Sequence, residues 1–146
     1  NIGAMLVAFI SILSMVNFSM EYFFQFNLQD ILGVLFSPLA WTMGIPWEEA
    51  RLVGRLMGEK IVLTELIAYG TLGDLIDSDL ISERSAIISS YALCGFANFG
   101  SIGIQLGGIG AMAPEKRNIL SKLVFKAMIG GALASWLTAT IAGLLI

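Results

Sequence analysis

Apolar runs near the two ends of the chain, over 2–20 and 125–146, dominate its hydrophobic pattern. The first run contains no charged residue and only small polar interruptions. Each run approaches the roughly 20 residues that a helix needs to cross a hydrocarbon core. The pattern therefore predicts transmembrane helices over 1–22 and 115–146.

A shorter amphipathic segment, 28–44, follows the first run. Its apolar residues recur at helical spacing on one face, and its polar residues lie off that face. Trp41 and Trp47 lie near its end, and tryptophan is enriched where membrane meets water. We therefore expect an interfacial helix along the membrane surface, bent or ended by Pro38.

The next stretch, 46–75, mixes charged residues with too few apolar residues for one clean span. Its charges include Arg51, Arg55 and Lys60, and several glycines lie between them. Two half-length helices fit this pattern better than one continuous helix. We predict a re-entrant helical hairpin, which enters and leaves on the same side of the membrane.

A glycine-rich apolar stretch, 91–110, is interrupted by the polar residues Asn98 and Ser101. Each glycine weakens a helix relative to alanine. Backbone that leaves the helix inside a bilayer must find internal partners or line a cavity. These features predict a broken transmembrane helix over 82–112, split near 96–100.

Composition and charge narrow the class of protein. Hydrophobic residues make up 57% of the chain, charged residues 13%, and the mean hydropathy is +0.84, so an all-α membrane protein is favoured. The net charge of −3, without basic clusters joined to aromatic residues, gives nucleic acid little to bind. The single cysteine, Cys94, cannot form an internal disulfide, and we expect it to be a small packing residue.

Catalytic patterns are missing from the sequence. It has no histidine, no catalytic triad and no phosphate-binding loop followed by lysine. We therefore expect a protein that is not an enzyme, with neither catalytic residues nor a protein-bound metal or cofactor.

Glu65 is the first candidate for binding chemistry. A carboxylate at the middle of a membrane costs roughly 2.5 to 3.5 kcal/mol on translocon scales, so it needs water, a partner or a ligand. From spacing alone, ligand binding weighs about evenly against two structural roles, which are capping a half-helix and pairing with Lys60.

Asn98 and Ser101 form the second candidate. They lie three residues apart, so both side chains can face one direction if a half-helix starts at the break. The alternative is that Asn98 caps that half-helix and Ser101 bonds back to its backbone. Phe96, taken alone, is expected to pack against other apolar side chains, although an aromatic edge also suits contact with a heterocycle.

These motifs resemble the concentrative nucleoside transporter family. The resemblance rests on FANFGS over 96–101 followed by IGI over 102–104, and on GEK over 58–60 leading to TELIAY over 64–69. It covers essentially the whole of 1–146, which is similar to the C-terminal half of an inverted-repeat transporter.

The resemblance implies roles for four residues in substrate binding. Glu65, Asn98 and Ser101 would contact the ribose of a nucleoside, and Phe96 would lie beside the base. Family members commonly have asparagine before and phenylalanine after the glutamate. Thr64 in this chain departs from that pattern, as does the leucine that follows Glu65.

The resemblance also implies partners. It predicts a nucleoside substrate, a missing N-terminal half, a lipid bilayer and a homotrimer, with a coupling cation, sodium or proton, whose site lies outside this chain. We expect a multi-pass protein of the plasma membrane, which is the inner membrane if the source is a bacterium. The predicted function is ion-coupled nucleoside transport by alternating access. The alternative is a structural or channel-like helical module that binds no nucleoside.

Overall fold

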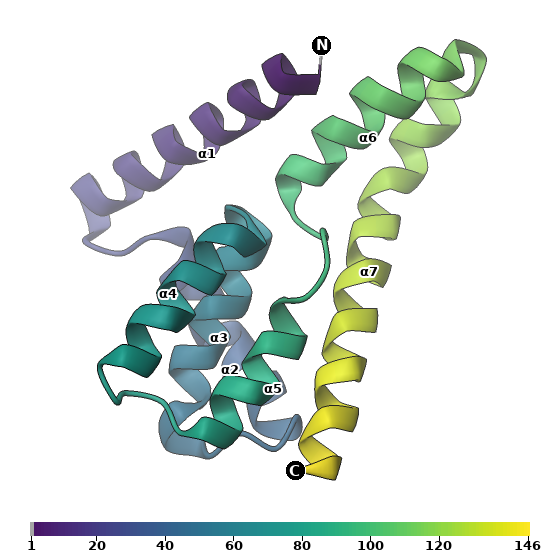
Figure 1. The fold of residues 1–146 in the computed structure, drawn as a ribbon. Coiled ribbons are helices and arrows are strands. Elements are labelled where there is room, and N and C mark those ends of the chain that lie inside the picture. The colour runs from purple at the N-terminus through teal and green to yellow at the C-terminus, as the bar shows by residue number, and fades with distance from the viewer. Residues whose placement is uncertain (1) are drawn as a thin grey trace.

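The computed structural model describes residues 2–146, so Asn1, the first residue of the predicted 1–22 helix, lies outside the described residues. Within that range the chain is all-helical and has no strand, in agreement with the predicted all-α class. In chain order the elements are α1 (Ile2–Phe24), α2 (Leu28–Thr42), α3 (Trp47–Val62), α4 (Glu65–Asp77), α5 (Glu83–Leu93), α6 (Phe99–Met112), the 3₁₀ turn η1 (Pro114–Lys116) and α7 (Arg117–Leu145) (Figure 1).

The helices form two groups along the long helix α7. Helices α2 to α5 form a cluster on one side of the lower part of α7, with α5 packed against it, whereas α6 lies along the upper part of α7 and contacts α1 (Figure 1). Among the described residues, only Pro114–Leu145 is both long and apolar enough to cross a membrane, by length and composition. The segment Ile10–Phe24 of α1 is apolar but shorter, so the membrane crossing of α1 stays a prediction.

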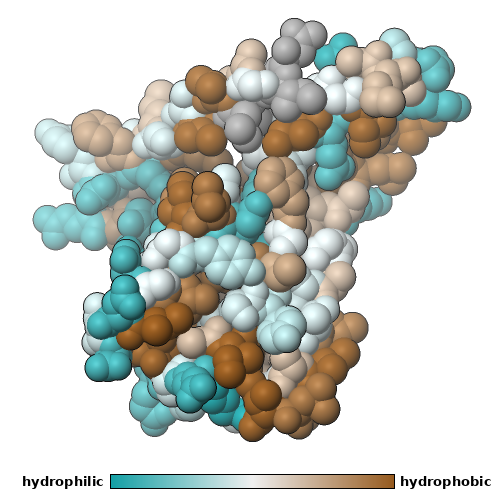
Figure 2. Space-filling view, viewed as in Figure 1, coloured by the Kyte–Doolittle hydropathy of each residue, from teal (hydrophilic) through white to brown (hydrophobic). Residues whose placement is uncertain are grey.

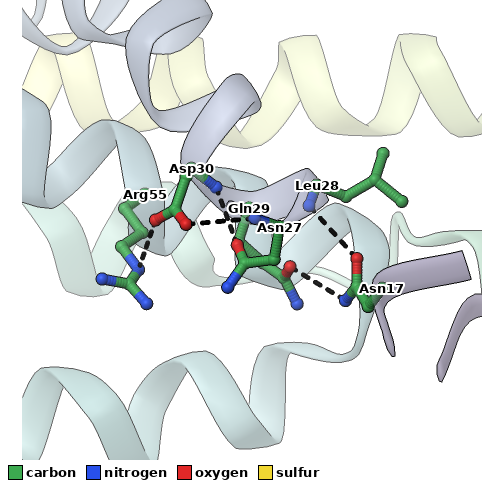
Figure 3. A network of polar contacts seen from close by, with 6 residues as sticks. All are labelled: Asn17, Asn27, Leu28, Gln29, Asp30 and Arg55. Atoms are coloured by element: carbon green, nitrogen blue, oxygen red, sulfur yellow. Dashed lines mark hydrogen bonds and ion pairs between the residues drawn. The ribbon is translucent and has the colours of Figure 1, made fainter. Parts of the chain in front are cut away.

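A polar network joins α1, α2 and α3 (Figure 3). Asn27 caps α2 by accepting from the backbone N–H of Asp30 at 3.0 Å, and the Asp30 carboxylate accepts the Asn27 N–H in return. Asn17 of α1 donates to Gln29 at 2.9 Å, and Arg55 of α3 lies 3.5 Å from Asp30. The start of α2 is therefore fixed from both neighbouring helices.

Pro38 lies inside α2, which continues to Thr42. Of the two predicted effects of Pro38, a bend or an end of the helix, the end is therefore not seen. Ser37 donates to the carbonyl of Gly33 at 2.6 Å, a local back-bond that accompanies this turn.

Glycine lets α2 and α3 approach closely. A methyl group at Gly54 would overlap the carbonyl oxygen of Gly33, and one at Gly58 would lie 2.8 Å from the Cβ of Leu32. Small residues at a helix crossing permit this backbone contact. The crossing therefore depends on glycine at these positions of α3.

The broken helix is split earlier than expected. Helix α5 ends at Leu93 and α6 begins at Phe99, so the break covers 94–98 rather than 96–100. Gly95 carries the turn with φ of +125°, a conformation that favours glycine. Gly100 lies within the first turn of α6 and is therefore not part of the break.

Apolar side chains cover much of the outer surface. Figure 2 shows hydrophobic residues toward the upper and lower ends of this face, with paler and more polar residues between them. On α7 the exposed apolar residues include Leu133, Leu137, Ile141 and Leu144, while the opposite side of the helix buries Trp136 in the core. This surface is typical of a protein that faces lipid or further helices.

Candidate functional site

Asn98 is the last residue of the break and the N-cap of α6. Its Oδ1 accepts from the backbone N–H of Ser101 at 2.8 Å, and the Ser101 hydroxyl donates to the Asn98 carbonyl at 2.6 Å. Both side chains are buried, at 0% and 1% exposure. The structure thus contains the capping arrangement that the sequence left open as an alternative.

Glu65 comes to the same point from another helix. It lies in the first turn of α4, whose N-cap Thr64 accepts from the Ile67 N–H at 3.4 Å. The Nδ2 of Asn98 donates to the Oε2 of Glu65 at 2.9 Å. The structure therefore brings together two predicted site residues that are 33 positions apart, at the start of two different helices.

Glu65 is the more accessible member of this pair. It is half-buried, and its hydrogen bond with Asn98 occupies only one carboxylate oxygen. An ionised carboxylate offers about four lone-pair positions, so acceptor capacity remains for hydroxyl donors of a ligand. Asn98 keeps a second amide hydrogen, whereas the hydroxyl of Ser101 is already used in the cap.

Lys60, in the last turn of α3, has a role that sequence analysis missed. The predicted alternative of a pair with Glu65 is not the arrangement seen. The Lys60 ammonium donates instead to the carbonyl of Ala92 at 2.9 Å and to the hydroxyl of Ser135 at 2.8 Å, and Lys60 is fully buried. Its sequence signal is a lysine that follows Glu59 and directly precedes the apolar residues Ile61 and Val62.

Opposite charges therefore stand at the two ends of the break. Ala92 belongs to the last turn of α5, where helix carbonyls lack partners and carry partial negative charge, and Lys60 binds there. Glu65 lies beside the N-terminal start of α6, where the partial charge is positive. Each side-chain charge has the opposite sign to the partial charge of the helix end beside it, so both interactions are attractive.

Two further contacts hold the helices that carry the site. The hydroxyl of Tyr69 in α4 donates to the carbonyl of Ser90 in α5 at 2.7 Å. The Ser82 hydroxyl, at the start of α5, donates to the Glu49 carboxylate of α3 at 2.9 Å. Helices α3 and α4 are thus tied to α5 near both of its ends.

Phe96 and Cys94 lie in the break itself. Phe96 is 55% exposed, so it does not fill the core of these described residues. Cys94 is also exposed, and the expectation that it is a packing residue is wrong. Its backbone has left the helix at the end of α5, which turns the side chain away from the packed interior.

Several known proteins are similar to this chain in both sequence and fold. The profile of the family described as "Na+ dependent nucleoside transporter C-terminus" matches residues 1–143. Transporter YutK of Bacillus subtilis is 43% identical over 100% of this chain and 37% of its own length, and nucleoside permease NupC of Helicobacter pylori is 37% identical with the same coverage. A CNTnw variant in an outward-facing state has a TM-score of 0.90 at 40% identity, covering 99% of this chain and 38% of its own. CNTnw in an inward-facing, substrate-bound state has a TM-score of 0.82 at 42% identity, covering 97% and 35%.

The all-helical fold, shared with these structures at about 40% identity, is that of a family of membrane transport proteins. Within that class, the chain belongs to the Na+-dependent nucleoside transporter family and corresponds to its C-terminal part. It spans a little over a third of the length of the two bacterial relatives.

Proposed function

We propose that this chain supplies the ribose-binding half of a nucleoside transporter that works by ion-coupled alternating access. The observation that carries the proposal is the contact between Glu65 and Asn98, where two helix starts meet. Broken helices in transporters present polar groups to substrate near the bilayer midplane. Glu65 combines remaining acceptor capacity with partial exposure, which suits a ligand rich in hydroxyl donors.

Four residues make up the proposed substrate site. Glu65, Asn98 and Ser101 contact the ribose, and the cap of α6 holds Ser101 beside Asn98. Phe96 is exposed in the break and presents its ring to the base. CNTnw, which shares this fold, has a substrate-bound inward-facing state, and this supports a substrate site in the family.

The remaining parts of the transporter lie outside this chain. Its coverage of its relatives supports a preceding half that completes the site and takes up the coupling cation, sodium by the family description. The cation is a second substrate that moves with the nucleoside. We place the complete protein in the plasma membrane as a multi-pass homotrimer, and it binds and releases its substrate without enzymatic chemistry.

We expect residues 46–75 to re-enter the membrane without crossing it. Helix α3 has 16 residues and α4 has 13, so each is shorter than the roughly 20 residues that a helix needs to cross the bilayer. Helix α3 also carries several charges that lipid would leave uncompensated. Single cysteines replacing Trp47 and Asp74, in a full-length protein without other cysteines, should react with an impermeant maleimide from the same side. Labelling from opposite sides would exclude the hairpin.

Ligand-dependent thermal stability tests the proposed function. A nucleoside at about 100 times its Kd should stabilise the purified full-length transporter by about 2.7 kcal/mol, because it binds only the folded state. The matched control is the free nucleobase at equal concentration, which lacks ribose and should protect much less. A nucleoside that gives no more protection than buffer would favour the structural or channel-like module.

A further inference from the structure

Lys60 carries an inference that rests on the proposed nucleoside site and extends it. We propose that Lys60 is a positioning residue: its ammonium group anchors the end of α5 to α3 and α7, and this anchor sets where Asn98 meets Glu65. The Lys60 ammonium is held by the Ala92 carbonyl and the Ser135 hydroxyl, away from the Glu65–Asn98 contact, so it acts through the polar break and not by touching the nucleoside.

The connections on both sides of the site are short. Lys60 precedes the turn that leads from α3 to Glu65, and Ala92 precedes the break that leads from α5 to Asn98. The bond between Lys60 and Ala92 therefore joins two segments that each continue directly into one half of the Glu65–Asn98 pair. A shift of α5 relative to α3 would displace Asn98 relative to Glu65.

The chemistry at Lys60 agrees with an anchoring role. The last carbonyls of a helix lack intrahelical partners, and an ammonium group satisfies one of them with a charge-assisted hydrogen bond. The second bond, to Ser135, fixes the same group to α7. An apolar side chain of similar length would fill this space without the cost of burying a charge, so simple packing does not explain a lysine here.

Substitution of Lys60 in the full-length transporter tests the proposal. The measurement is the ratio of Kd values for a 3′-deoxynucleoside and the parent nucleoside, determined by binding titration on folded protein. Lys60→Met keeps the length of the side chain but removes its charge and donors. We expect nucleoside affinity to fall about tenfold, as for the loss of one charge-assisted hydrogen bond, and the ratio to fall by a similar factor.

Matched controls separate positioning from general destabilisation. Met57→Ala removes a fully buried side chain elsewhere in α3, so it should lower the thermal midpoint but leave the ratio unchanged. If Lys60→Met does not fold, Ser135→Ala removes one partner of Lys60 and should lower the ratio about two- to threefold. Thr138→Ala, which removes an exposed hydroxyl from α7, is its control.

The outcomes are distinguishable. A wild-type ratio clearly above one that falls in Lys60→Met but not in Met57→Ala supports the role of Lys60. A folded Lys60→Met or Ser135→Ala protein that keeps the wild-type ratio overturns it. A wild-type protein that binds both ligands equally overturns the ribose site itself, and this inference with it.

Discussion

Glu65→Gln is expected to weaken nucleoside binding by about tenfold or more. The substitution keeps the size of the side chain, and its amide oxygen can still accept from Asn98, so the fold should tolerate it. It removes the negative charge that strengthens hydrogen bonds from ribose hydroxyls. A hydrogen bond to a charged group contributes roughly 1.5 to 3 kcal/mol, which corresponds to this loss of affinity.

Titrations with a nucleoside and its 3′-deoxy analogue measure this effect. Gln105→Ala is the matched control, because Gln105 is a half-buried polar residue further along α6 and lies outside the proposed site. Asn98→Ala should resemble Glu65→Gln, since it removes the partner that orients the carboxylate. If Glu65→Gln bound the nucleoside as tightly as wild type and still discriminated against the analogue, the ribose would have to bind elsewhere.

Gly54→Ala should lower the free energy of unfolding of the protein by forcing α2 and α3 apart. The added methyl group would overlap the carbonyl oxygen of Gly33 and come within 2.9 Å of the backbone nitrogen of Ser37. These neighbours are backbone atoms, which cannot rotate away, so α2 and α3 would have to separate. Overpacking of this kind costs about 1–3 kcal/mol or more, which exceeds the roughly 1 kcal/mol that alanine gains over glycine in a helix.

Thermal unfolding of the purified full-length protein in detergent checks the effect. Gly70→Ala in α4 is the matched control, because no atom of the described residues lies within 4 Å of a methyl group added at that position. The control should unfold at or slightly above the wild-type temperature, whereas Gly54→Ala should unfold several degrees lower. Equal midpoints for the two variants would show that the close crossing of α2 and α3 is not rigid.

Local signals in the sequence explain why much of the helical order could be predicted. Ser82 begins α5 as its N-cap, as serine prefers, and α3 carries acidic residues in its first turn, where the helix dipole favours them. Pro38 left two outcomes open, a bend or an end of the helix, and the sequence alone could not choose between them. The break was misplaced because glycine is abundant there, and only Gly95 has the backbone conformation that demands it.

The candidate site shows where sequence reasoning ends. The capping of α6 by Asn98 involves residues three positions apart, so it could be weighed from spacing. The meeting of Asn98 with Glu65 depends on tertiary packing, and only the family resemblance brought the two residues into one proposed site. Lys60 binds the backbone carbonyl of Ala92 and the hydroxyl of Ser135, which is 75 positions away. Neither alanine nor serine at such a distance gives a sequence pattern that predicts the contact.

The separations of these contacts along the chain have a consequence for biogenesis. Lys60 and Glu65 leave the ribosome before α5 and α6, so both charges are already available when the break reaches the membrane. Lys60 meets Ala92 across 32 positions, but it gains Ser135 only after most of α7 has been made, 75 positions later. A nascent transporter that stops short of Ser135 would leave part of a buried ammonium unsatisfied. Chains truncated within α7 before Ser135 should therefore be substrates for membrane quality control.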